Sequence, residues 1–220
     1  MMSQNTIALI AAFVYIFAAI GIAEGLRKWR GYPAEFTRKF IHIAVGMWAY
    51  GTVLLFKSRA WAIIPPLTFV LINAFSYRQG TFKAMETGEK ENLGTIYFPI
   101  SFAALIWLLW GRPHLLVASL MPMTWGDALA AVLGRHFGRR TYTVLGSARS
   151  LEGSAVMFLA GWAATLAALL LLGSTDPLTT VWVAAATALS ATAVEALSPW
   201  GIDNLTVPAV SALLLVLMMQ

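Results

Sequence analysis

Eight apolar stretches, each about as long as a membrane-spanning helix, constrain this 220-residue chain more than any other feature. A helix needs about 20 mostly apolar residues to cross the hydrocarbon core of a bilayer. Hydrophobic residues make up 59% of the chain and charged residues 11%, whereas soluble domains usually carry about 25% charged residues. The composition excludes an ordinary soluble domain and a disordered chain, and it predicts a polytopic membrane protein.

The predicted fold is an all-α bundle of about eight transmembrane helices, with seven as the alternative, in a single integral-membrane domain over residues 1–220. Helices are favoured for every span because lipid offers no partner for unpaired backbone groups. Pro65 and Pro66 predict a kink or a local break in the third span. The predicted spans are 6–23, 40–56, 60–76, 95–110, 114–134, 153–172, 179–197 and 204–219.

Lys and Arg are distributed unequally between the two sides that these spans define. The loops 24–39, 77–94, 135–152 and 198–203 lie on one side and carry 12 Lys and Arg, against 3 on the other side. Cytoplasmic loops carry the excess of Lys and Arg. We therefore expect the basic side to be cytoplasmic and, for an even number of spans, both termini to face outward. These loops explain the net charge of +5 without nucleic-acid binding.

Acidic residues near the cytoplasmic ends of the spans are the first candidates for function. Asp127 lies about two helical turns inside the fifth span, and Glu195 lies near the end of the seventh. Ionisable groups in a membrane are costly and usually face a polar cavity or a partner. For Glu195, a helix-end carboxylate that reaches water is an equal alternative. Asp203 and Asn204 have the alternative role of capping the last helix.

Small residues recur at every fourth position of the fifth span. A stripe of this kind is typical of a face that packs closely against another helix. We expect it to hold Asp127 near neighbouring helices without taking part in chemistry. The stripe consists of Gly126, Ala130, Gly134 and Gly138.

Basic residues open the second span. Arg38, Lys39 and His42 share one helix face because they are three and four residues apart. Basic residues at a helix entrance are more often topology determinants and headgroup anchors. Two cations that point the same way as a histidine nevertheless favour an anion site.

Carboxylates, cations and a histidine together are typical of a site for a divalent cation and phosphate groups. Asp or Glu holds Mg²⁺ together with substrate phosphates, and Arg and Lys neutralise the remaining oxygens. The sequence contains no P-loop, protein-kinase, HExxH or GxSxG motif, and it has no cysteine for a thiolate site. The inventory fits phosphoryl transfer, which depends mainly on positioning and charge neutralisation.

The run GDALAAVLGRHFGRRTYTVLGSARSLEGS (126–154) resembles the signature of the CTP-dependent polyprenol kinase family. That family includes dolichol, phytol and farnesol kinases and is distantly related to the CDP-diacylglycerol synthases. Three more segments fit the family in the same order, and the four together cover most of the chain from residue 38. They are RKFIHIAVG (38–46), NLGTIYFP (92–99) and VEALSPWGIDNLTVP (194–208).

The resemblance implies transfer of the γ-phosphoryl group of CTP to an isoprenoid alcohol such as phytol, farnesol, a polyprenol or dolichol. It implies Mg²⁺ as cofactor, held by Asp127, Glu195 and Asp203, which are also the implied catalytic residues. The implied partners are the lipid alcohol, the nucleotide and the bilayer, and the oligomeric state stays open. The residues implied to bind the nucleotide and its phosphates are Arg38, Lys39, His42, Arg139, Arg140, Arg149, Ser150, Glu152 and Asn204. Family members often have Lys where this chain has Arg149, and Arg keeps the positive charge.

Two other functions compete with this interpretation. A phosphatidate cytidylyltransferase would also use CTP and Mg²⁺, but its metal-binding signature is not found in the sequence. A transporter is favoured by helix breaks of the kind that Pro65, Pro66 and Pro122 suggest, but the acids gather at one side and not at the midplane. The sequence does not specify the chain length of the alcohol.

Overall fold

The computed structural model describes residues 2–79, 93–173 and 175–220. Two compact units make up the chain, unit 1 from Met1 to Trp110 and unit 2 from Gly111 to Gln220. The sequence predictions at Lys83, Lys90, Glu91 and Asn92 lie outside the described residues. The single domain over the whole chain stays a prediction, because two compact units can belong to one domain.

Unit 1 is made of helices whose apolar faces meet in one core. Ile16 and Ile20 of the first helix pack with Ile41 of the second and Phe69 of the fourth. The helices are α1 (Gln4–Arg30), α2 (Ala34–Leu55), α3 (Arg59–Ala62), α4 (Ile64–Gln79) and α5 (Gly94–Leu109). This core holds α1, α2 and α4 together within the unit.

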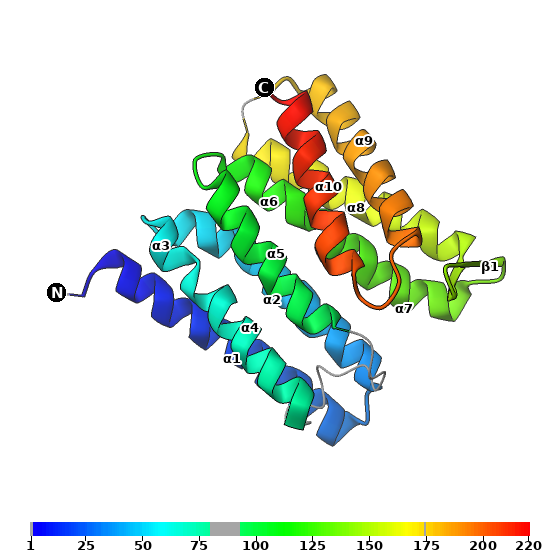
Figure 1. Ribbon diagram of the computed structural model, residues 1–220, viewed down its shortest axis with the longest axis horizontal. Helices are drawn as coiled ribbons and strands as arrows, with labels where there is room; N and C mark the ends of the chain where they lie inside the picture. Colours follow the sequence, from blue (N-terminus) through cyan, green and yellow to red (C-terminus); the bar gives the residue numbers. More distant parts are fainter. Residues whose placement is uncertain (1, 80–92, 174) are drawn as a thin grey trace. The chain divides into compact units, whose positions relative to one another are not determined.

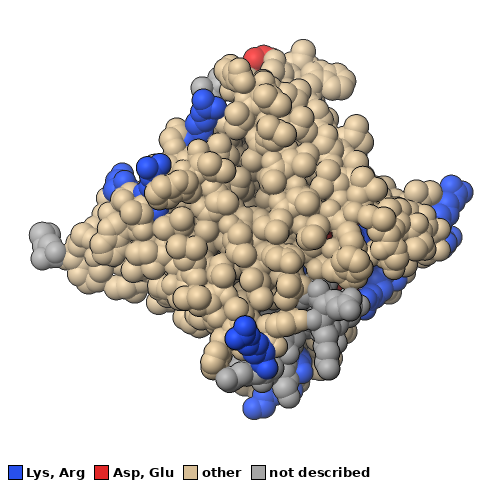
Figure 2. All heavy atoms as spheres, in the orientation of Figure 1, with Lys and Arg blue, Asp and Glu red and all other residues tan. Residues whose placement is uncertain are grey.

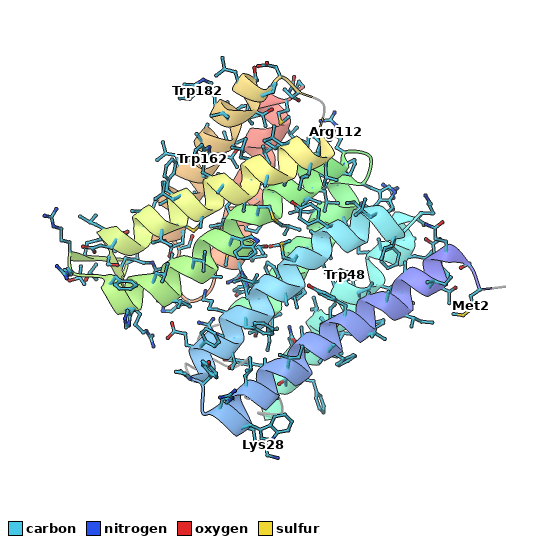
Figure 3. The ribbon with its side chains drawn as sticks, turned by 180° about the vertical axis from the view of Figure 1, so that it is seen from behind. Met2, Lys28, Trp48, Arg112, Trp162 and Trp182 are labelled. Carbon is cyan, nitrogen blue, oxygen red and sulfur yellow. The ribbon has the colours of Figure 1, made fainter. Side chains whose placement is uncertain are left out.

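Helix α1 is long enough to cross a bilayer, since its 27 residues span about 40 Å. Ser3 caps its start by accepting a hydrogen bond from the Thr6 N–H at 3.2 Å. Gly31 ends it in the left-handed conformation, with φ of 69°. Figure 3 shows Lys28 near this end of the helix and Met2 at the other. The basic last turn therefore lies a full span away from the N-terminal end of α1.

The third predicted span is broken, as its two prolines predict. α3 ends at Ala62 and α4 begins at Ile64. Pro65 and Pro66 therefore lie in the first turn of α4, where a missing N–H leaves no helical hydrogen bond unmade. The break consequently precedes the prolines and does not fall on them.

Unit 2 contains the remaining helices and a β-hairpin. α8 packs against α6, α7 and α9 and is the centre of the unit; Figure 1 shows it among them. The elements are α6 (Pro113–Met121), the π-helical segment η1 (Pro122–Asp127), α7 (Ala128–Phe137), β1 (Thr141–Val144), β2 (Ser147–Ser150), α8 (Leu151–Leu172), α9 (Pro177–Ala196) and α10 (Asp203–Met218).

The hairpin is a feature that the sequence analysis did not predict. Strands β1 and β2 pair antiparallel, with Tyr142 opposite Arg149. Leu145 and Gly146 form the turn with φ of 47° and 80°, the positive values that a two-residue hairpin turn requires. Apart from this hairpin, the predicted all-α bundle is confirmed.

Several helices have the dimensions of membrane spans. Five are long and apolar enough, by length and composition, among the described residues. They are Gln4–Arg30, Arg59–Arg78, Pro113–Phe137, Leu151–Leu172 and Pro177–Ala196. α5 and α10 are apolar but shorter. On the face drawn in Figure 2, residues other than Lys, Arg, Asp and Glu cover nearly all of the surface, as a lipid-facing protein requires. A multi-pass membrane protein is confirmed, and the number eight stays a prediction.

Candidate active site

Asp127 is positioned by an irregular turn inside a continuous helical segment. Between α6 and α7, residues Pro122–Asp127 adopt a π-helix, a rare form that is found frequently at functional sites. Asp127 is the last residue of this π-turn and is buried, with 7% of its surface exposed. The fifth predicted span therefore carries its acid at the point where the α-helical hydrogen bonding is interrupted.

The small-residue stripe packs against α8, as predicted. A Cβ at Gly126 would lie 2.7 Å from the Met157 Sδ and 2.8 Å from the Met157 carbonyl oxygen. A Cβ at Gly134 would lie 3.0 Å from the Gly153 Cα. These separations are too short for an ordinary side chain, so the glycines set how closely η1 and α7 approach α8. The position of Asp127 depends directly on this contact.

A tight turn brings the other two acids to the same place. Glu195 lies in the last turn of α9, and Asp203 is the first residue of α10. Between them, Trp200 and Gly201 have φ of 54° and 81°, left-handed values that let the chain reverse direction within a few residues. The Ser198 hydroxyl donates to the Val194 carbonyl oxygen at 2.7 Å, which fixes the end of α9. In Figure 1 the end of α9 and the start of α10 meet beside α7.

Asp127, Glu195 and Asp203 form a compact carboxylate cluster. Each offers an oxygen, and these oxygens all lie within 4.8 Å of one another. Asp127 and Glu195 are each only 7% exposed, and Asp203 is half-buried. Two like charges 4 Å apart repel by about 4 kcal/mol at an effective dielectric constant of 20. Three oxygen ligands at this spacing suit a hard divalent cation, and no other such group of His, Asp or Glu occurs in the described residues.

Asn204 orients one acid of the cluster. Its backbone N–H donates to Asp203 Oδ1 at 2.9 Å, and its amide Nδ2 donates to the same oxygen at 3.0 Å. Nδ2 also donates to the Gly201 carbonyl oxygen at 3.2 Å. Ile202 occupies the N-cap position of α10 and makes no side-chain cap. These bonds fix the Asp203 carboxylate relative to the turn, and the nucleotide-binding role of Asn204 stays a prediction.

Arg149 reaches from β2 to the end of α9. Its Nε lies 2.7 Å from Glu195 Oε1. This is a close charge contact and not an aligned hydrogen bond, since Nε has no hydrogen-bond partner within the described chain. Nη2 donates to the carbonyl oxygens of Ser198 at 3.2 Å and Glu195 at 3.5 Å. The guanidinium contacts a carboxylate and two carbonyl oxygens, and the phosphate-binding role predicted for Arg149 stays a prediction.

Other predicted phosphate-binding residues join the hairpin to α8. Glu152 Oε2 accepts hydrogen bonds from the backbone N–H groups of Arg139 at 3.1 Å and Arg140 at 3.2 Å. The Ser150 hydroxyl accepts from the Gly153 N–H at 3.0 Å and caps α8. The Arg139 and Arg140 side chains are exposed. Arg139 and Arg140 lie at the foot of the hairpin, and their phosphate-binding role stays a prediction.

The basic motif of the second span belongs to unit 1. Lys39 is 6% exposed, and Arg38 and His42 are half-buried. The His42 ring lies 4.4 Å, centroid to centroid, from the ring of Phe98 at the start of α5. The carboxylate cluster lies in unit 2, so a common substrate for the two groups stays a prediction.

Two contacts that shape the site are not predicted from the sequence. One is the pairing of Arg149 with Glu195, and no signal in the sequence links two residues that are 46 positions apart. The other is the 2.6 Å hydrogen bond between the Tyr142 and Ser154 hydroxyls, which joins the hairpin to α8. The alternation in Thr-Tyr-Thr-Val, followed by Leu-Gly, was the available signal for that hairpin.

Comparison with known proteins decides the family. A phytol kinase of Synechocystis sp. is 33% identical over 219 residues, which cover 94% of this chain and 90% of the relative. The chain belongs to the phytol kinase family. A probable chloroplastic phytol kinase of Oryza sativa is 25% identical, over 90% of this chain and 68% of its own length. A chloroplastic farnesol kinase of Arabidopsis thaliana is 25% identical, over 70% of this chain and 54% of the relative's own length. No family model and no solved structure matches the chain.

Membership of the phytol kinase family confirms the predicted resemblance. These relatives are named as kinases of phytol and farnesol, so the predicted class, a lipid-alcohol kinase in a membrane, is confirmed at that level. The donor CTP, the cofactor Mg²⁺, the role of each site residue and the side of the membrane stay predictions.

Proposed function

We propose that this member of the phytol kinase family transfers the γ-phosphoryl group of CTP to an isoprenoid alcohol, with phytol and farnesol as the first candidates and polyprenols or dolichol as longer ones. The observation that carries the proposal is the convergence of three acids, two of them buried, in the same unit as Arg139 and Arg140 at the foot of the hairpin. A site for phosphoryl transfer needs mainly this combination of metal ligands and positive charge.

The carboxylate cluster fits the divalent cation that the family resemblance implies. Asp127, Glu195 and Asp203 supply hard oxygen ligands close enough to share one ion. Mg²⁺ bound there would neutralise charge on the phosphate oxygens as it develops during transfer. Asn204 holds Asp203 in place through two hydrogen bonds, so this one ligand is oriented before substrate binds.

The basic side chains divide into two groups in this proposal. Arg139 and Arg140 extend from the foot of the hairpin in unit 2 and pair with phosphate oxygens through their exposed guanidinium groups. Arg38, Lys39 and His42 of α2 form the second group, in unit 1, and their proposed nucleotide-binding role comes from the family resemblance. Ser150 and Glu152 shape the segment between α7 and α8 and thereby orient the arginines.

The lipid alcohol attacks the γ-phosphorus through its hydroxyl oxygen. A new oxygen–phosphorus bond forms while the bond between the γ-phosphorus and the oxygen that bridges it to the β-phosphorus breaks, so CDP leaves. The hydroxyl proton passes to a carboxylate, Asp127 or Asp203, either of which also orients the hydroxyl. The isoprenoid tail stays among the apolar helix surfaces, where it keeps its contact with lipid.

We place the reaction on the cytoplasmic side. The loops next to the cluster, 135–152 and 198–203, lie on the side with 12 of the 15 Lys and Arg residues. The excess of Lys and Arg in short loops marks the cytoplasmic side, and the nucleotide donor is present there. Both termini would then face the opposite side.

The decisive experiment follows labelled γ-phosphate from CTP, ATP, GTP and UTP into a panel of lipid alcohols, with the folded protein in nanodiscs. We expect labelled phytyl or farnesyl phosphate, with release of CDP when CTP is the donor. Release of pyrophosphate from CTP with phosphatidate would favour a cytidylyltransferase instead. Absence of labelled lipid with all four nucleotides would contradict the kinase proposal.

A further inference from the structure

The guanidinium of Arg149 contacts the segment that carries one acid of the cluster. The guanidinium contacts the Glu195 carboxylate at 2.7 Å and the carbonyl oxygens of Glu195 and Ser198. The Arg149 side chain is 24% exposed and the Glu195 side chain 9%. A half-buried guanidinium beside a buried carboxylate is held firmly in one geometry, because separation of the pair would leave the buried carboxylate charge uncompensated.

The contacts involve both the side chain and the backbone of the same short segment. The carbonyl oxygens of Glu195 and Ser198 lie at the end of α9, where helical carbonyls carry partial negative charge. The Glu195 carbonyl oxygen also accepts from the Ser198 N–H at 3.0 Å, and Arg149 donates to both carbonyl oxygens while it contacts the carboxylate. One side chain of β2 therefore fixes the end of α9 and the direction of the Glu195 side chain together.

The charge balance of the cluster also favours the contact between Arg149 and Glu195. When ionised, the three carboxylates carry three negative charges, and Arg149 compensates one of them. One divalent cation bound there would neutralise the remaining two, so the cluster would have no net charge in a poorly solvated setting. A phosphate that attracted Arg149 away would leave Glu195 buried beside two other acids with its partner lost.

We propose that Arg149 is a positioning residue, which acts through Glu195 to hold the third ligand of the divalent-cation site, and that it is not a phosphate ligand. This inference rests on the proposed function only in assigning a cation to the cluster. The role follows from the contact with Glu195. It differs from the role proposed for Arg139 and Arg140, whose side chains are exposed.

The test replaces Arg149 with Met, which keeps much of the apolar stem and removes the charge and the donors, and with Lys, which keeps the charge. Binding of Mn²⁺ alone is measured by electron paramagnetic resonance in nanodiscs. Steady-state kinetics then separate kcat from the KM for CTP. Arg140→Met serves as the comparison, because Arg140 is exposed at the hairpin foot.

For Arg149→Met we expect Mn²⁺ affinity and kcat to fall by about 10-fold to 100-fold, as is typical when a partner of a metal ligand is removed. The KM for CTP should change by less than about 3-fold, and Arg149→Lys should recover part of the loss. Arg140→Met should show the reverse pattern, with a raised KM for CTP and unchanged Mn²⁺ affinity. In a Glu195→Gln background, Arg149→Met should cause almost no further loss of Mn²⁺ affinity or kcat.

Different results would contradict the positioning role of Arg149 in different ways. A raised KM for CTP with unchanged Mn²⁺ affinity in Arg149→Met would make Arg149 a phosphate ligand. Tighter Mn²⁺ binding would mean that Arg149 only repels the cation. If Arg149→Met does not fold, Arg149→Lys must show the same direction of change, and unchanged Mn²⁺ affinity there overturns the proposal. If wild-type protein binds Mn²⁺ but phosphorylates no alcohol, the proposed function fails while the role of Arg149 is still decided.

Discussion

Unit 1 and unit 2 assemble their candidate functional residues in different ways. In unit 1, Arg38, Lys39 and His42 come from little more than one turn of α2 and are neighbours because of helical spacing alone. In unit 2, Asp127, Glu195 and Asp203 come from η1, α9 and α10 and meet only because the helices pack.

This difference shows which part of the site is sensitive to packing. A change elsewhere in unit 1 leaves the α2 motif intact as long as α2 remains helical. In unit 2, by contrast, the approach of η1 to α8 and the turn between α9 and α10 both decide whether three oxygens lie within one ion's reach. Substitutions far from the acids but within these contacts should therefore impair the site.

The largest expected effect is the loss of an acid from unit 2. Asp127→Asn should lower phosphoryl transfer by at least about 100-fold, because it removes a charged ligand where transition-state charge is neutralised. Turnover is measured with CTP, Mg²⁺ and phytol. Asp176→Asn is the matched control, since Asp176 caps the opposite end of α9 and Asn also serves as a cap. Near-native turnover of Asp127→Asn would remove Asp127 from the mechanism.

The next prediction compares one glycine in each unit. Gly126→Ala places a Cβ against Met157, so we expect a loss of about 1–3 kcal/mol in stability and a clear loss of turnover. Gly21→Ala on α1 meets nothing within 4 Å, so it should leave turnover unchanged and should not lower stability, because Ala favours a helix more than Gly does. Thermal unfolding and turnover are measured on both variants. Equal behaviour of the two would contradict the claim that close packing positions Asp127.

The basic motif of unit 1 should give a smaller effect, limited to nucleotide binding. Arg38→Gln should raise the KM for CTP by about 10-fold, the value of one charge-assisted hydrogen bond, with little change in thermal stability. Arg30→Gln, at the exposed end of α1, is the control. A KM that is the same in both variants would identify Arg38 as a topology determinant instead of a nucleotide ligand.

The smallest effect concerns a helix cap in unit 2. Asp176 Oδ2 accepts a hydrogen bond from the Thr179 N–H at 2.9 Å, and this bond lowers the pKa of Asp176. A lowered folded-state pKa means that the stabilisation is complete above the unfolded pKa of about 4 and is lost as the pH falls through the folded value. Asp176→Ala should therefore lower Tm slightly at pH 7 and not at about pH 2. A pH-independent difference in Tm would show that the charge contributes nothing.

Much of the fold follows from the sequence because hydropathy and helix signals act locally. The predicted span 153–172 corresponds to α8, Leu151–Leu172, with the start moved by the Ser150 cap. The hairpin was missed because its strands have four residues each and its turn uses Leu145 where Asn or Gly is usual.

The site is less predictable than the fold. The sequence identified all three acids, because charge at membrane depth is unusual and the segments resemble a known family. It could not show that Glu195 meets Arg149, or that Glu152 binds the N–H groups of Arg139 and Arg140. Those pairings depend on how β2 approaches the end of α9 and on the close packing of α7 against α8, which no local pattern encodes.

The most direct test of the central claim is a count of divalent cations bound by unit 2 in the whole protein. Mn²⁺ binding to the protein in nanodiscs is titrated by electron paramagnetic resonance, without nucleotide, for wild type and for Asp127→Asn, Glu195→Gln and Asp203→Asn. We expect one Mn²⁺ per chain, displaced by Mg²⁺, with affinity reduced in all three variants and unchanged in Asp176→Asn. Absence of a specific Mn²⁺ in wild type, or equal affinity in all the variants, would contradict the claim that the three acids form one cation site.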